Sequence, residues 1–220
     1  MIERYTRPEM AALWSDETRY ALWVRVEVAV CRVLAARGEI PRDAFEHIEK
    51  TARVEPRRVA EIELQVQHDV NAFLDALAEV VGPTSRYVHL GLTSSDVLDS
   101  SFAMQLRDAA ELILRETERA LEVLRRRALE HRKTACVGRT HGMFAEPTTF
   151  GLKLLGAFSE LRRDRERLER ARDQIAVGKI SGAVGTFAHL SPEIEVAALR
   201  ELGLRPAEVS TQIVPRDRHA

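Results

Sequence analysis

Three histidines, His68, His89 and His141, lie at predicted junctions between helices, each close to an aspartate, a glycine or a threonine. Histidine is the side chain whose charge changes near neutral pH, so it is suited to donate or accept a proton in catalysis. Junction residues can converge at the ends of a helical bundle. One such histidine is more often a hydrogen-bonded structural residue; three of them together weaken that interpretation but leave it open beside a site of acid–base chemistry.

The segment Thr93-Ser94-Ser95-Asp96 has the spacing of a capping box, in which a carboxylate follows a hydroxyl by three residues. We expect a long helix to begin here. Such a helix end presents free N–H groups and the positive end of the helix dipole, which favour a carboxylate or a phosphate. The segment therefore predicts a helix cap and an anion-binding site at once.

The segment Gly138-Arg139-Thr140-His141-Gly142 places a histidine between glycines, whose flexibility lets the backbone approach a ligand closely. Cys136 could form a Cys/His dyad with His141, although a cysteine buried as a small apolar residue is far more common. The seven histidines form no metal-binding spacing with a nearby carboxylate or thiolate. We therefore predict no metal site and no cofactor.

The predicted secondary structure around these candidate residues is almost all helical. The patterns predict a helix from Ser15 to Gly38, two shorter stretches after Pro41 and Pro56, and a helix over 69–81. Longer helices are predicted from Ser94 to about Arg132 and after Pro147, joined by residues 133–148. The first carries an apolar stripe that includes Phe102, Ala109, Ile113 and Ala128. A glycine-rich loop at 178–189 precedes a last helix, capped by Ser191 and ended by Gly203.

These elements predict an all-α fold, in which a small helical domain over 1–92 precedes long helices at 93–220. A helix of such length cannot bury its apolar stripe within a small domain, so we expect half of an elongated bundle. The segment Val214-Pro215-Arg216-Asp217 reads as the opening of another helix just before the sequence ends. We therefore expect the bundle domain to be truncated.

Composition narrows the class of protein. Lys and Arg number 33 and Asp and Glu 34, so no basic field for nucleic acid is expected. The first residues do not resemble a signal peptide, and no apolar run is long enough to span a membrane. The two cysteines suggest no disulfide framework. We expect a cytoplasmic protein that binds neither nucleic acid nor membrane.

Several segments, taken in order, resemble the fumarase/aspartase superfamily and, within it, the adenylosuccinate lyase family. The resemblance covers the whole chain. It rests on Glu3-Arg4-Tyr5, His68-Asp69-Val70-Asn71-Ala72-Phe73, Val88 to Asp96, Gly138-Arg139-Thr140-His141, Glu146 to Lys153, Gly182 to Thr186, and Thr211-Gln212.

The resemblance implies a β-elimination that releases fumarate from adenylosuccinate to give AMP, and from the succinylated carboxamide ribotide SAICAR to give AICAR. It implies that His141 is the general acid, that His68 supports it and that His89 belongs to the pocket. The substrate contacts that it implies are Arg4 and Tyr5 at the phosphate, Thr93 and Ser94 at a carboxylate, Thr140 beside His141, and Gln67, His68, Asp69 and Gln212 elsewhere.

The resemblance also implies a homotetramer whose sites draw on three subunits. The family's general base is a serine in a Ser-Ser-x-Met-Pro-x-Lys-x-Asn-Pro loop, and the 220 residues contain nothing like it. We therefore predict that the chain alone does not turn over substrate. The alternatives are another lyase of the superfamily, namely argininosuccinate lyase or carboxymuconate cycloisomerase, and a non-catalytic helical assembly module.

Overall fold

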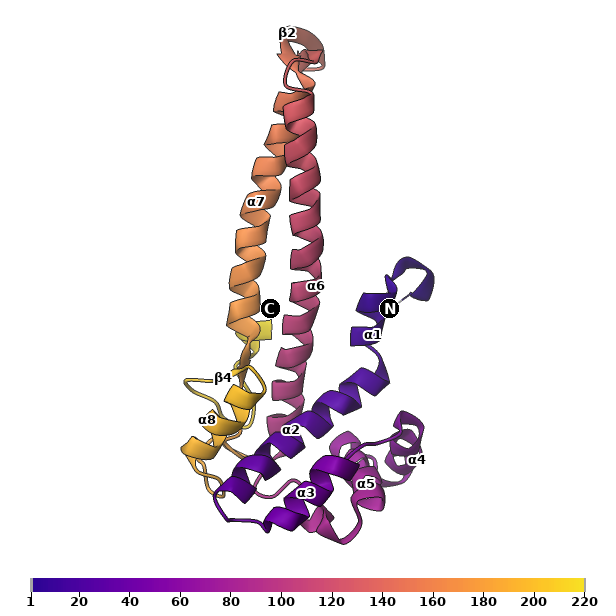
Figure 1. The fold of residues 1–220 in the computed structure, drawn as a ribbon, viewed down its shortest axis with the longest axis vertical. Helices are drawn as coiled ribbons and strands as arrows, with labels where there is room; N and C mark the ends of the chain where they lie inside the picture. Colours follow the sequence, from indigo (N-terminus) through magenta and orange to yellow (C-terminus); the bar gives the residue numbers. More distant parts are fainter. Residues whose placement is uncertain (1, 220) are drawn as a thin grey trace. The chain divides into compact units, whose positions relative to one another are not determined.

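The computed structural model describes residues 2–219 and is built mainly of helices, which confirms the all-α prediction. The α-helices are α1 (Pro8–Leu13), α2 (Asp16–Ala36), α3 (Arg42–Thr51), α4 (Pro56–Val66), α5 (Asp69–Val81), α6 (Ser94–Glu130), α7 (Phe150–Ile175) and α8 (Pro192–Glu201) (Figure 1). Short 3₁₀ helices are η1 (Glu3–Tyr5), η2 (Gly82–Tyr87) and η3 (Arg216–His219). The strands are β1 (Ala135–Thr140), β2 (Met143–Thr149), β3 (Val177–Gly178) and β4 (Arg205–Pro206).

The chain divides into two compact units. Unit 1 contains the residues up to Asp108 together with those from Gln174 onwards, and unit 2 contains Ala109–Asp173. The units divide inside α6 and α7, whereas the predicted domains, 1–92 and 93–220, meet at the start of α6. The predicted domain division stays a prediction.

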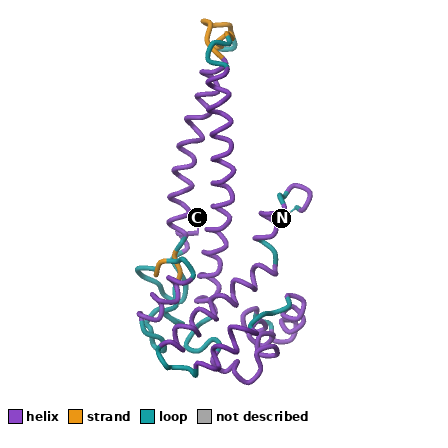
Figure 2. Tube along the Cα trace, viewed as in Figure 1, coloured by secondary structure: helices purple, strands orange, loops and turns teal. Residues whose placement is uncertain are grey.

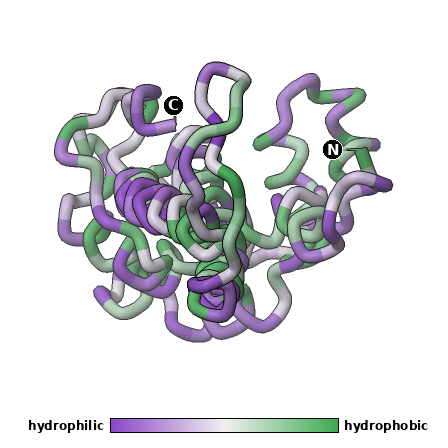
Figure 3. Tube along the Cα trace, turned by 90° about the horizontal axis from the view of Figure 1, so that it is seen from above, coloured by the Kyte–Doolittle hydropathy of each residue, from purple (hydrophilic) through white to green (hydrophobic). Residues whose placement is uncertain are grey.

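The core of unit 1 forms around α2, which contacts α3, α4 and α8. Ser15 caps this helix as predicted, since its hydroxyl oxygen accepts the Thr18 N–H at 3.2 Å. An aromatic cluster fixes α2 against α5: Tyr20 stacks on Phe73 with ring centroids 6.2 Å apart, and Trp23 meets Phe73 edge-on at 5.3 Å. Hydrophobic and hydrophilic residues alternate along the helices, as is typical of amphipathic helices (Figure 3).

The two long helices confirm the prediction in part. Helix α6 begins at the predicted Ser94, but α7 begins at Phe150 rather than directly after Pro147. In unit 2 the helices lie side by side, and ion pairs join them, Arg165 to Glu118 at 2.7 Å and Arg172 to Glu111 at 2.8 Å (Figure 1). No helix in the part of the chain that the structure describes is both long and apolar enough to cross a membrane.

The apolar stripe predicted for α6 is only partly buried. Ala109 and Ala128 are buried, whereas Ile113 and Phe102 remain 47% and 38% exposed. A single helix partner covers a narrow strip of α6, so the remainder of the stripe is left without cover.

Residues 133–148 were predicted to connect the long helices. In the structure, β1 and β2 form an antiparallel hairpin in this connection (Figure 2). Thr140 pairs with Met143, which leaves His141 and Gly142 as a two-residue turn with φ values of 51° and 74°. Positive φ at both positions is typical of the type I′ turn, whose twist matches that of the strands. The sequence analysis missed the hairpin in this connection because it treated the glycines of the segment as signs of flexibility.

Candidate active site

His89 is held in unit 1 by a buried carboxylate that the sequence did not single out. Both oxygens of Glu27 on α2 are used: one accepts the His89 backbone N–H at 2.8 Å, the other lies 2.6 Å from the ring Nδ1. The Glu27 side chain is 1% exposed and that of His89 is 20% exposed. Because Glu27 contacts Nδ1, the other ring nitrogen, Nε2, is the one left for a ligand.

Glu27 could have been recognised from its position on α2. It falls four residues after Trp23 and three before Val30, both of which are buried. An acidic residue on an apolar stripe must be paired, because burial of an unpaired charge is costly.

One of the two side-chain bonds of the predicted capping box is formed at the start of α6. The Asp96 carboxylate accepts the Thr93 N–H at 2.8 Å, and Asp96 itself is fully buried. Thr93 and Ser94 are half-buried. The first N–H groups of a helix have no acceptor within it, and the anion-binding role predicted for this helix end stays a prediction.

Lys179, in the glycine-rich loop after β3, forms a buried ion pair with Asp96 in which both side chains are 0% exposed. Its ammonium group also donates to the Gly182 carbonyl oxygen at 3.1 Å, and the Gly182 N–H donates to Asp96 at 3.2 Å. The loop is thereby fixed to the first turn of α6. The sequence analysis missed Lys179; its signal is a single charge between Gly178 and Ile180 in an uncharged loop.

One turn further along α6, Asp99 fixes the segment that carries Gln212. Its carboxylate accepts the Val214 N–H at 2.7 Å and pairs with Arg216 at 2.9 Å. The same segment meets the glycine-rich loop where the Ser181 and Ser210 hydroxyls lie 2.9 Å apart. Gln212 is exposed between these two anchors.

Glu195 on α8 completes the set of buried carboxylates. It accepts the Ile180 N–H at 2.6 Å. Burial raises the pKa of Glu195, the charge of Asp96 raises it further, and the Ile180 N–H and Lys179 lower it. Asp96 and Glu195 are thus two neighbouring buried acidic groups, and Lys179 is the cation close to both of them.

His68 is held only locally. It caps α5 in the predicted position, where its Nδ1 accepts the Asn71 N–H at 3.3 Å and lies 3.4 Å from Asp69. Gln67 ends α4 in the left-handed region, with φ 54°. His68 and Gln67 are exposed and Asp69 is half-buried. These contacts do not link His68 to His89 or Thr93.

Arg4 and Tyr5 belong to η1, and both are exposed. The Arg4 guanidinium lies 4.7 Å from the centre of the Tyr5 ring. A cation and a phenol hydroxyl so placed could together bind a phosphate, which is the role predicted for them.

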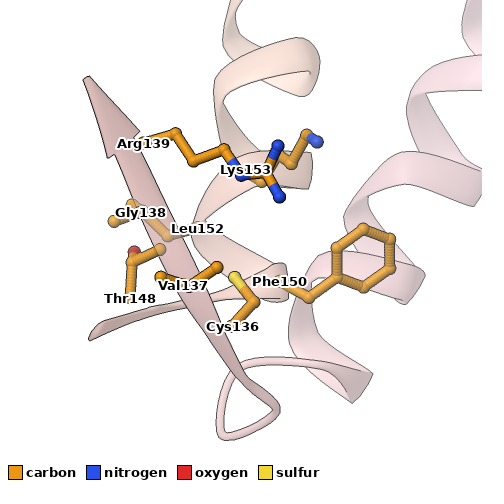
Figure 4. Close-up of a pocket in the computed structure, with 8 residues that line it drawn as sticks. All are labelled: Cys136, Val137, Gly138, Arg139, Thr148, Phe150, Leu152 and Lys153. Atoms are coloured by element: carbon orange, nitrogen blue, oxygen red, sulfur yellow. The ribbon is translucent and has the colours of Figure 1, made fainter. Parts of the chain in front are cut away.

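His141 and Thr140 belong to unit 2, at the hairpin turn, and both are exposed. The hairpin forms one wall of a pocket of about 560 Å³, in which Arg139 and Lys153 are the cations (Figure 4). The lining residues are Cys136, Val137, Gly138, Arg139, Thr148, Phe150, Leu152 and Lys153.

Backbone strain marks three of the predicted site positions. Among residues 2–219, the non-glycine residues with positive φ are Gln67, His89, His141 and Phe187. Such conformations disfavour residues with a Cβ and collect at functional sites. Gln67, His89 and His141 are therefore functional candidates on backbone geometry as well as on chemistry.

The chain resembles known lyases over its whole length. A family model described as lyase matches residues 3–220. Adenylosuccinate lyase from Synechocystis sp. is 51% identical over 220 residues, 100% of this chain and 51% of that protein. The enzyme of the same name from Bacillus subtilis is 45% identical, again over 100% of this chain and 51% of the relative. The chain thus spans about half the length of the curated relatives it matches.

Solved structures give the same fold. A fumarate lyase from Mesorhizobium sp. BNC1 has a TM-score of 0.85 and 32% identity, over 92% of this chain and 49% of that one. The 3-carboxy-cis,cis-muconate lactonizing enzyme from Pseudomonas putida has a TM-score of 0.83 and 33% identity, over 93% of this chain and 48% of that one.

Proposed function

The chain belongs to the lyase family, and from this premise we propose that it supplies part of the active site of an adenylosuccinate lyase. The observation that carries the proposal is the 51% identity to the Synechocystis relative over all 220 residues. The proposed reaction releases fumarate from adenylosuccinate to leave AMP, and from SAICAR to leave AICAR.

The elimination makes two demands that residues of this chain can meet. A C–H bond beside a carboxylate must lose its proton, so negative charge builds up on that carboxylate. Thr93 and Ser94, at the N-terminus of α6, are suited to stabilise that charge with hydroxyl and backbone donors. The C–N bond must then break, and we assign to His141 the donation of a proton to the leaving nitrogen, with Thr140 beside it.

The remaining predicted residues complete the substrate site in this proposal. His89 would present Nε2, because Nδ1 is occupied by Glu27. His68 would support His141, while Arg4 and Tyr5 would hold the phosphate. Gln67, Asp69 and Gln212 would contact the rest of the substrate.

We further propose that the chain alone is inactive and acts in a complete enzyme, with a second half like that of its relatives. The serine loop that serves the family as general base has no counterpart among the 220 residues. The exposed apolar residues of unit 2 support a homotetramer, since other bundle helices would cover them. They include Ile113, Val123, Leu129, Leu152 and Leu155, from 47% to 60% exposed.

A lactonizing or cycloisomerase activity is the second candidate, favoured by the structural likeness to the Pseudomonas enzyme at 33% identity. The adenylosuccinate lyases are more similar, and the Thr140-His141 pair supplies the acid that an elimination of nitrogen needs.

A substrate panel tests the proposal. Adenylosuccinate, argininosuccinate and 3-carboxymuconate are each offered to the complete enzyme, and fumarate, AMP and lactone are measured. The proposal expects fumarate and AMP in equal amounts from adenylosuccinate. Lactone formation without AMP would support the second candidate instead.

A further inference from the structure

The ion pair between Asp96 and Lys179 lies directly beneath the proposed carboxylate site. Asp96 is in the first turn of α6, and its carboxylate accepts the N–H of Thr93, one of the residues assigned to the substrate carboxylate. A full negative charge in this buried position would oppose a dicarboxylate bound at Thr93 and Ser94.

Lys179 is the group that offsets this charge. Its side chain is 0% exposed and contacts Asp96 and the Gly182 carbonyl oxygen. Other charged groups near the pair are Glu195 on α8 and, one turn along α6, Asp99, whose charge Arg216 offsets. Without Lys179, Asp96 and Glu195 would form an uncompensated acidic cluster behind the helix end.

We propose that Lys179 is a positioning residue of the lyase site, which fixes the glycine-rich loop to α6 and neutralises Asp96 so that Thr93 and Ser94 can bind a carboxylate. This inference rests on the proposed function. It assigns Lys179 no contact with substrate, because the side chain is wholly buried. Its effect therefore passes through Asp96.

A merely structural ion pair makes a different prediction. Removal of either partner of a buried pair leaves the other charge unpaired and destabilises the fold. On that account Lys179→Met and Asp96→Asn would weaken the binding of all ligands alike. If Lys179 neutralises Asp96 for the substrate, the two substitutions have opposite effects on an anion at the helix end.

The experiment measures the affinities of fumarate and of AMP for the complete enzyme by calorimetry. We expect Lys179→Met to weaken fumarate binding by about tenfold or more and to leave AMP binding within about twofold. We expect Asp96→Asn, which keeps the lysine charge, to bind fumarate at least as tightly as the wild type. The double variant should recover most of the fumarate affinity that Lys179→Met loses. Lys50→Met, at an exposed position on α3, is the matched control and should change neither affinity.

The possible results distinguish a failure of this inference from a failure of the proposed lyase function. A wild-type enzyme that binds neither fumarate nor AMP overturns the proposed function, and this inference with it. A wild-type enzyme that binds fumarate overturns only the inference if Lys179→Met binds it equally well or loses both ligands in parallel. Should Lys179→Met fail to fold, Asp96→Asn decides alone, and weaker fumarate binding by that variant overturns the inference.

Discussion

His89 in unit 1 and His141 in unit 2 share a left-handed backbone conformation, with φ of 60° and 51°. Their surroundings differ. Glu27 binds both the backbone and the ring of His89 from a buried position, and Lys179, Asp96 and Asp99 fix the neighbouring loops. His141 lies on an exposed hairpin turn, and its ring makes no hydrogen bond to any of residues 2–219.

The two units hold their candidate site residues in different ways. Unit 1 positions its candidates with buried charges of its own, so those positions contribute to both folding and function. In unit 2 the pairing of β1 with β2 sets the turn, so the exposed His141 side chain is free to meet groups from elsewhere. Substitution of a charged residue that holds the unit 1 positions should therefore change both stability and function, whereas substitution of the His141 side chain should change activity with little effect on stability.

The largest expected effect is that of His141→Asn on activity. We expect kcat of the complete enzyme to fall by about 10²–10⁴-fold, the usual contribution of a general acid. Asparagine tolerates positive φ, so the turn and the melting temperature should be retained. The measurement is fumarate release under steady-state conditions. Met143→Asn, at a neighbouring position that is 70% exposed, is the control; equal losses in both variants would contradict the role of His141.

One glycine in each unit allows the packing of the two units to be compared. Gly142 and Gly185 both have positive φ, 74° and 78°, but a Cβ at Gly185 would overlap the Ser210 carbonyl oxygen, whereas one at Gly142 would have no described atom within 4 Å. Gly142→Ala should cost about 1 kcal/mol, from backbone strain alone. Gly185→Ala should cost more than about 2 kcal/mol, because it also pushes the Gln212 segment from the loop. Denaturant unfolding measures both, and equal costs would refute the packing inferred for unit 1.

Glu27→Gln tests whether His89 depends on a buried charge. Glutamine keeps one acceptor but loses the second and the charge, so we expect the free energy of unfolding to fall by about 1–3 kcal/mol. Glu17→Gln, on the exposed side of the same helix, should change it by less than about 0.5 kcal/mol. A Glu27→Gln protein as stable as the wild type would show that the contact with His89 contributes nothing.

The smallest effect concerns the two cysteines, one in each unit. Burial and the charge of Glu27 raise the pKa of Cys31 to about 12, so almost no reactive thiolate forms near neutral pH. Cys136 is half-buried. We expect iodoacetamide to label Cys136 well before Cys31, and both at similar rates in denaturant, as measured by mass spectrometry. Faster labelling of Cys31 in the folded protein would contradict its burial.

The sequence predicted the helices best, because their signals are local. Helix α5 was predicted over 69–81 and observed there, and Ser15 and Thr93-Asp96 cap helices as their residue types require. The hairpin was missed because a two-residue turn of His141 and Gly142 lacks the Asn-Gly or Asp-Gly pair that usually marks such turns.

The buried charges were not predictable in the same way. Glu27 is 62 residues from His89, and Asp96 is 83 from Lys179, so no local pattern pairs them. The place of Glu27 on an apolar stripe indicates that its charge must be paired, but it does not indicate which residue is the partner. The candidate site residues themselves came from the family resemblance, and their joint role stays a proposal.

We propose that this chain carries one part of a lyase site, which includes the general acid His141 but not the general base. The most direct measurement is fumarate release from adenylosuccinate by the purified 220-residue chain, alone and after addition of the C-terminal half of a curated relative. We expect no turnover by the chain alone, and turnover that depends on His141 when the second half is present. Clear turnover by the chain alone, abolished by His141→Asn, would contradict the claim that the base is missing.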